Sequence, residues 1–121
     1  MMTEWEILFH PEFFEEIKGL EASVVKKIFA RYRILERKGP RLGRPFADTL
    51  RAGDVKNLKE LRFTVDAIAW RIAYYFNQHR QGILLCGGKK SDKLLYDKLI
   101  ATAKRRMTDG KTPIHISESS L

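Results

Sequence analysis

The sequence predicts a small α+β domain with the element order strand, helix, helix, strand, strand, strand, helix. Its 121 residues are enough for one hydrophobic core but too few for two. Two segments in the middle alternate apolar and polar residues, as strands with one buried face do. Segments on either side of them repeat apolar residues at helical spacing. We therefore expect two N-terminal helices packed on a small, mainly antiparallel sheet, followed by a C-terminal helix.

The first elements can be placed from residue 5 onward. Residues 5–9 combine alternation with a short apolar run and predict a strand, which His10-Pro11 ends. Pro11 suits the first position of a short helix, which Gly19 interrupts. A second helix follows until Gly39-Pro40, because its apolar residues are spaced by four, four, four and three. These residues are Leu20, Val24, Ile28, Tyr32 and Leu35.

The second half begins with a long loop over residues 39–53, rich in glycine, proline and arginine. Strands are predicted over residues 58–65, 68–76 and 83–86, the last one short and buried. A final helix starts at Ser91 or Asp92, either of which can cap it, and ends near Thr108. We expect one domain over residues 1–108 and a polar, flexible tail over residues 109–121.

Composition and charge exclude several classes of protein. No apolar run approaches the roughly 18 residues of a membrane span, and the first residues do not resemble a secretory signal, so we expect a cytoplasmic protein. The single cysteine, Cys86, excludes an internal disulfide and a cysteine-rich metal site. His10, His79 and His115 stand alone in the sequence, so we expect no metal, no cofactor and no catalytic triad.

The net charge of +8 is unevenly distributed along the chain. Residues 1–25 hold six acidic residues and one basic residue, whereas residues 26–51 hold nine basic and two acidic residues. Such a basic body suits an anionic partner, of which nucleic acid is the commonest. The alternative is a solvated, lysine-rich surface that only maintains solubility.

The polar face of the two long predicted strands is the first candidate site. If their apolar faces cover the helices, Glu60, Arg62, Arg71 and Tyr75 stand on an open, concave face. Arg71 lies between two alanines, an arrangement that leaves room for a phosphate on the guanidinium group. The alternative is a half-exposed arginine paired with Glu60 or Asp66.

A second candidate follows the last strand. In Gly87-Gly88-Lys89-Lys90, the glycines let a ligand approach the backbone and the lysines supply positive charge. The segment lacks the spacing of a phosphate-binding P-loop, and alone it is equally consistent with a basic turn. Tyr96, in the following helix, either joins the core or points its hydroxyl toward the sheet.

Four segments in this order resemble the RelE/ParE toxin superfamily, and most of all its phage-derived, HigB-like branch. They are Leu42-Gly43-Arg44-Pro45, Asn57-Leu58-Lys59-Glu60-Leu61-Arg62, Trp70-Arg71-Ile72-Ala73-Tyr74-Tyr75-Phe76 and Leu84-Leu85-Cys86-Gly87-Gly88-Lys89-Lys90. The resemblance covers roughly residues 5–108. It implies the toxin of a type II toxin–antitoxin system, held inactive by a cognate antitoxin. It also implies a metal-independent endonuclease that binds in the ribosomal A site and cuts mRNA by attack of a ribose 2′-hydroxyl.

The resemblance also implies roles for single residues. Arg71 matches the strand arginine that stabilises the transition-state phosphate, and Lys90 matches a basic residue at the scissile phosphate. Tyr96 falls where relatives place a tyrosine near the 2′-hydroxyl. The implied RNA or phosphate contacts are Arg62, Lys89, Lys93, Lys59 and Arg44.

The general base is open, because Glu60 stands where the RelE type has a lysine. Glu60 is able to accept a proton, and it is equally able to orient Arg62 or Arg71. Two other functions compete with the nuclease: a ParE-like gyrase inhibitor, and an inactive relative that only binds antitoxin or RNA. The basic residues with Tyr96 favour the nuclease. The antitoxin surface is not assigned by the sequence.

Overall fold

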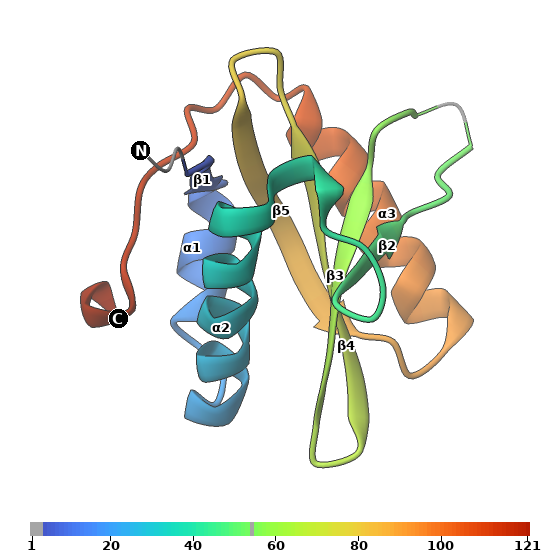
Figure 1. Ribbon diagram of the computed structural model, residues 1–121. Coiled ribbons are helices and arrows are strands. Elements are labelled where there is room, and N and C mark those ends of the chain that lie inside the picture. Colours follow the sequence, from blue (N-terminus) through green and yellow to red (C-terminus); the bar gives the residue numbers. More distant parts are fainter. Residues whose placement is uncertain (1–3, 54) are drawn as a thin grey trace.

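The computed structural model describes residues 4–53 and 55–121 and confirms the α+β class (Figure 1). Residues 1–3 of the predicted domain lie outside the described residues. The elements in chain order are β1 (Glu6–Phe9), α1 (Pro11–Ile17), α2 (Ala22–Lys38), η1 (Gly39–Arg41), β2 (Ala47–Thr49), β3 (Lys59–Val65), β4 (Ile68–Phe76), β5 (Gln81–Lys89), α3 (Lys93–Met107) and η2 (Glu118–Ser120).

The strands form one sheet in the order β1-β5-β4-β3-β2. All neighbours are antiparallel except β1 and β5, which are parallel. In Figure 1, α1 and α2 lie on one side of the sheet and α3 on the other. None of the described helices is long and apolar enough to cross a membrane.

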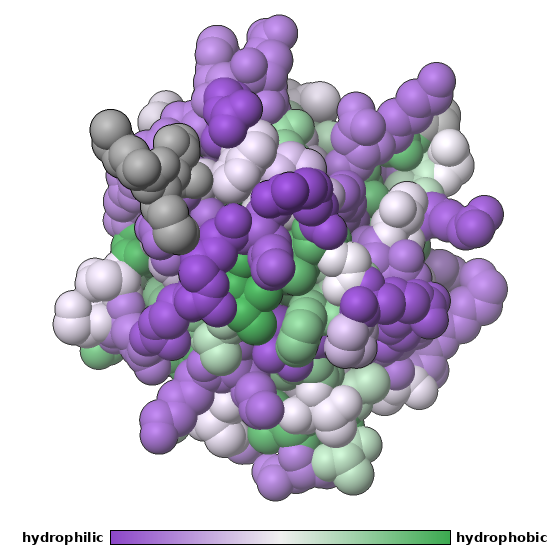
Figure 2. All heavy atoms as spheres, viewed as in Figure 1, coloured by the Kyte–Doolittle hydropathy of each residue, from purple (hydrophilic) through white to green (hydrophobic). Residues whose placement is uncertain are grey.

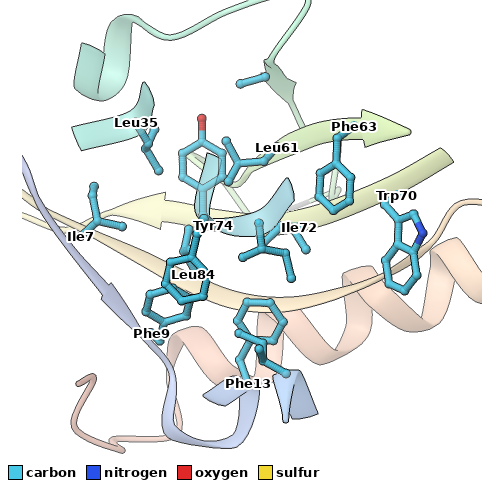
Figure 3. Packing of buried hydrophobic residues seen from close by; sticks show 14 of the residues in the cluster. Ile7, Phe9, Phe13, Leu35, Leu61, Phe63, Trp70, Ile72, Tyr74 and Leu84 are labelled. Atoms are coloured by element: carbon cyan, nitrogen blue, oxygen red, sulfur yellow. The ribbon is translucent and has the colours of Figure 1, made fainter. Parts of the chain in front are cut away.

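The face toward α1 and α2 carries the larger core (Figure 3). Leu61 and Phe63 on β3 and Trp70, Ile72 and Tyr74 on β4 are buried there, as the alternation predicts. They pack against helix residues such as Phe13, Ile28 and Leu35. Figure 2 shows hydrophilic residues over most of the surface in view, with smaller areas of hydrophobic residues between them.

The opposite face is not the open surface that the sequence predicts. α3 packs across β5 and β4 and forms a second, smaller core. Leu99 and Ala103 on α3 are buried against Leu85 and Ala73 on the sheet. The apolar stripe of α3 needs a surface to cover, and this face is the one that α1 and α2 leave vacant.

Two segments outside the predicted elements are more ordered than expected. The predicted loop over residues 39–53 contains η1 and β2, which is too short to show an alternating pattern. The tail, predicted to be flexible, instead packs along β1: Phe9 and Ile114 exchange two backbone hydrogen bonds of 2.8 and 2.9 Å. Ile116 is buried in the larger core, so the apolar residues of the tail hold it on the outer edge of the sheet.

Candidate active site

The register of β3 and β4 gathers the polar residues of the predicted face. Arg62 lies directly opposite Arg71, and Glu60 lies opposite Ala73. Since residues opposite each other share a face, Glu60, Arg62 and Arg71 are neighbours on the side of α3. Two arginines in this position repel each other, and the carboxylate beside them offsets the repulsion.

Glu60 is the centre of this cluster. Its Oε2 lies 3.3 Å from Nε of Arg71 and 3.6 Å from Nε of Arg62. Glu60 and Arg71 are only 4% and 7% exposed, whereas Arg62 is partly exposed. Nη1 of Arg71 also donates to the carbonyl of Trp70 at 2.9 Å. The buried carboxylate therefore forms ion pairs with both guanidinium groups, while Nε of Arg71 has no hydrogen-bond partner among the described residues.

Tyr96, on the first turns of α3, completes the cluster. Its hydroxyl donates a hydrogen bond to Oε1 of Glu60, while its ring packs against the second core. Burial, and then the bond to Glu60, raise the pKa of this hydroxyl. Of the two placements open from the sequence, the hydroxyl toward the sheet is the one observed. Nζ of Lys90 lies 4.9 Å from the centre of the ring, on the same side of the sheet.

A basic groove of about 540 Å³ adjoins the cluster. It is lined by Lys27, Arg31, Arg44, Pro45, Arg62, Phe63, Thr64 and Arg71. Five cations from four parts of the chain therefore face one space, without an acidic residue among the lining residues. A phosphodiester backbone is the ligand that such a groove suits best.

Arg31 and Lys27 were not among the predicted site residues. Both lie on α2, four residues apart, so they share the helix face that borders the groove. Nε of Arg31 donates to the carbonyl of Arg62 at 2.9 Å, and its guanidinium lies over the ring of Phe46. Their spacing was visible in the sequence, but their position beside Arg62 and Arg71 was not, because it depends on how α2 lies across the sheet.

The remaining predicted residues lie around the cluster or away from it. Arg44 donates to Asp48 at 2.7 and 3.0 Å and lowers the pKa of that carboxyl. Lys59 donates to the carbonyl of Pro40, and Lys93 pairs with Asp97 at the exposed start of α3. Lys89 lies opposite Trp70, which places it on the other face of the sheet from Arg71.

His10 is not isolated, contrary to the sequence prediction. Nε2 lies 2.7 Å from Oδ2 of Asp109, and Nδ1 accepts from the backbone N–H of Glu12 at 3.1 Å. One nitrogen of His10 and one carboxylate oxygen each of Glu12 and Asp109 lie within 4.8 Å of one another, although Asp109 is 99 residues from His10 in the sequence. Both ring nitrogens are thus engaged within the chain, where they cap α1 and hold the start of the tail.

The cluster contains three kinds of functional group that can take part in a reaction. The carboxylate of Glu60 can accept a proton, and the guanidinium groups of Arg71 and Arg62 can stabilise negative charge. The raised pKa of Tyr96 keeps its hydroxyl a hydrogen-bond donor at neutral pH. Attack of a hydroxyl on a phosphodiester needs these three functions.

Comparison with known proteins agrees with this fold. The toxin RelE of E. coli, solved as a double-arginine mutant in the free state, superposes with a TM-score of 0.65. The match covers 86% of this chain and 98% of RelE at 13% identity, which shows the shared fold. The chain therefore has the RelE fold, as the sequence resemblance implies.

The family itself follows from the sequence comparisons. The model of the phage-derived Gp49-like proteins matches residues 15–108, and the chain belongs to this family. Two toxins of Mycobacterium tuberculosis strain H37Rv, HigB2 and HigB3, are each 37% identical over 90 residues. Those residues are 72% and 73% of this chain, but 45% of HigB2 and 77% of HigB3.

Proposed function

We propose that this chain is the toxin of a type II toxin–antitoxin system and cuts mRNA on the ribosome. In this proposal it acts in the cytoplasm, binds in the ribosomal A site and is neutralised by a cognate antitoxin. The observation that carries the proposal is the buried Glu60 held between Arg71 and the hydroxyl of Tyr96. If the ion pair of Glu60 and Arg71 were only structural, the basic groove beside it would have no role. This groove fits an RNA backbone, which supports a catalytic cluster.

The reaction is a transfer of the phosphate within the RNA. The 2′-oxygen forms a bond to phosphorus while the bond to the 5′-oxygen breaks, leaving a 2′,3′-cyclic phosphate and a 5′-hydroxyl. Glu60 accepts the proton of the 2′-hydroxyl, and the 5′-oxygen takes up a proton as it leaves. Because the substrate provides its own nucleophile, we propose that the reaction is independent of metal and specific for RNA.

Arg71 and Arg62 stabilise the charge that develops on the phosphate. Both are already paired with Glu60 beside the groove, so they stand close to the phosphate that the groove would bind. Lys90 lies beside Tyr96 and adds positive charge from the end of β5. Tyr96 positions the carboxylate by its hydrogen bond, and its raised pKa keeps it a donor at neutral pH.

Induced expression with mapping of mRNA ends tests this proposal. We expect growth arrest and new 5′-hydroxyl ends within translated messages from the unaltered chain. Arg71→Ala is expected to lower cleavage by about 100-fold or more, because it removes a preorganised charge at the phosphate. Arg37→Ala is the control, since Arg37 is exposed on α2 and outside the groove.

Each other outcome indicates a different function. Arrest with intact messages contradicts the nuclease and favours a gyrase inhibitor of the ParE type. Absence of arrest, with antitoxin binding retained, favours an inactive relative. Equal loss of cleavage in Arg71→Ala and Arg37→Ala contradicts the catalytic role of Arg71.

A further inference from the structure

The second half of β5 is an open edge of the sheet. β1 pairs with β5 only from Glu6 opposite Gln81 to Phe9 opposite Leu84. The N–H of His10 still donates to the carbonyl of Leu84, and the chain then leaves the sheet at Pro11 to form α1. Among the described strands, only β4 pairs with β5 beyond this point.

The pairing with β4 shows which backbone groups are free to bind a strand. The N–H of Lys90 donates to the carbonyl of Ala69, so Lys90 faces β4, and by alternation Gly88 and Cys86 do as well. Gly87 and Lys89 consequently direct their N–H and C=O groups away from β4. Such groups at a sheet edge readily pair with another extended chain.

A groove of about 390 Å³ runs along this edge. Its floor is the strand segment from Cys86 to Lys89, one wall is Glu16 of α1, and the other wall is α3. The residues contributed by α3 are Leu95, Lys98, Leu99, Thr102, Arg105 and Arg106. Leu95 is 43% exposed and offers an apolar contact at one end. The groove therefore has the shape and the open backbone that an extended peptide needs.

The charge of this groove selects an acidic peptide. Lys89, Lys98 and Arg105 stand on its rim. Glu16 does not counter them, because Arg106 donates to its Oε1 at 2.9 Å and to its Oε2 at 2.5 Å. Arg106 also donates to the carbonyl of Leu85 at 2.9 Å, where the pairing of β4 and β5 shifts register, and so fixes the wall of the groove.

We propose that this groove binds an extended, acidic segment of the antitoxin, which adds to the sheet as a strand beside Gly87 and Lys89. The partner's identity as an antitoxin rests on the proposed function. A peptide suits the site better than RNA because the free N–H and C=O groups of the floor match a peptide backbone. The groove is distinct from the catalytic cluster, because Glu60, Arg62, Arg71 and Tyr96 are not among the residues that line it.

The first test measures amide hydrogen exchange of the full chain in two states, free and in a complex purified together with its antitoxin. We expect the amides of Gly87 and Lys89 to exchange rapidly in the free chain and at least tenfold more slowly in the complex. Equal exchange in the two states would overturn the proposal. This measurement needs no substitution and no cleavage, so it remains decisive if the chain has no nuclease activity.

The second test separates this groove from general electrostatic attraction. Lys98→Glu/Arg105→Glu reverses two exposed charges on its wall, and Lys26→Glu/Arg37→Glu makes the same change in charge on exposed positions of α2. We expect the first pair to weaken antitoxin binding by roughly tenfold or more and the second by less than twofold. Equal weakening by both pairs would contradict the proposal.

RNA is the alternative ligand for this groove. Measuring mRNA cleavage in the absence of antitoxin distinguishes RNA from a peptide. We expect Lys98→Glu/Arg105→Glu to cut mRNA as the unaltered chain does, because neither residue lies in the catalytic cluster. Loss of cleavage in this variant, with an unchanged melting temperature, would assign the groove to RNA and overturn the proposal. Failure of the nuclease proposal itself is detected separately, by the effect of Arg71→Ala.

Discussion

Both faces of the sheet are covered by helices, but the side chains that they bury differ in size and polarity. The face toward α1 and α2 buries large apolar side chains, among them Phe9, Phe13 and Tyr74. The face toward α3 buries smaller ones, such as Ala73 and Ala103, and beside them the charged pair Glu60 and Arg71. One face thus holds the larger apolar core, while the other combines a smaller core with a polar cluster.

The difference follows from how far α3 reaches. α3 packs on β5 and, to a smaller extent, on β4, so it covers only part of the sheet. Tyr96 marks the boundary: its ring belongs to the second core and its hydroxyl to the cluster. Charged groups placed there are largely shielded from water but remain next to the open groove. In the proposed function, this combination would strengthen their electrostatic effect on a phosphate.

The largest effect on stability is expected from the face of α1 and α2. Leu84 is fully buried in the larger core, and Leu84→Ala is expected to lower the free energy of unfolding by about 2–5 kcal/mol. Leu94→Ala is the control, because Leu94 is 66% exposed and should change it by less than about 0.5 kcal/mol. Urea unfolding measures both. A loss below about 1 kcal/mol for Leu84→Ala would contradict the assignment of stability to this face.

The cluster on the other face is expected to cost stability rather than supply it. Glu60→Ala leaves Arg71 buried without its carboxylate and is expected to destabilise the fold by about 3 kcal/mol. Replacing both partners, as Glu60→Leu/Arg71→Met, is expected to recover that loss in full or to exceed it. Neither variant should cleave mRNA. A double variant that is no more stable than Glu60→Ala would show that the ion pair itself stabilises the fold.

The sequence predicted the faces of β3 and β4 because alternation alone fixes which side chains share a face. Leu61, Phe63 and Trp70 could be assigned to the core in this way, and Arg62 and Arg71 to the other side. The proximity of Glu60 to Arg71 followed from the same pattern, since both stand on the polar face of neighbouring strands.

What the sequence could not supply were contacts between elements that are far apart in the chain. The packing of α3 over the second face, and hence the bond from Tyr96 to Glu60, depends on the path of the chain after β5. The same holds for Arg31 in the groove and for Asp109 beside His10. No local period encodes such contacts. Such contacts form only when the apolar faces of distant elements pack against each other.

Two tyrosines offer a finer comparison of the faces, because the hydroxyl of Tyr74 is buried and that of Tyr96 is partly buried beside the cluster. The hydroxyl of Tyr74 has no hydrogen-bond partner among the described residues, whereas that of Tyr96 donates to Glu60. At pH 7, Tyr74→Phe is therefore expected to leave stability unchanged or raise it by up to about 1 kcal/mol. Tyr96→Phe is expected to lower it by about 1 kcal/mol.

The stability of Tyr74→Phe and Tyr96→Phe should depend less steeply on pH in alkaline solution than that of the unaltered chain. Burial raises the pKa of Tyr74, and burial together with Glu60 raises that of Tyr96, above the ordinary value of 10.0. Above pH 10 the unfolded chain loses these protons while the folded chain keeps them, so stability falls as pH rises. Each Tyr→Phe substitution removes one such proton and should flatten the fall by up to about 1.4 kcal/mol per pH unit. Urea unfolding between pH 9 and 11 measures the slope. If Tyr96→Phe left it unchanged while Tyr74→Phe flattened it, the hydroxyl of Tyr96 would be free in solution, and the cluster would lack the donor that holds Glu60 in place.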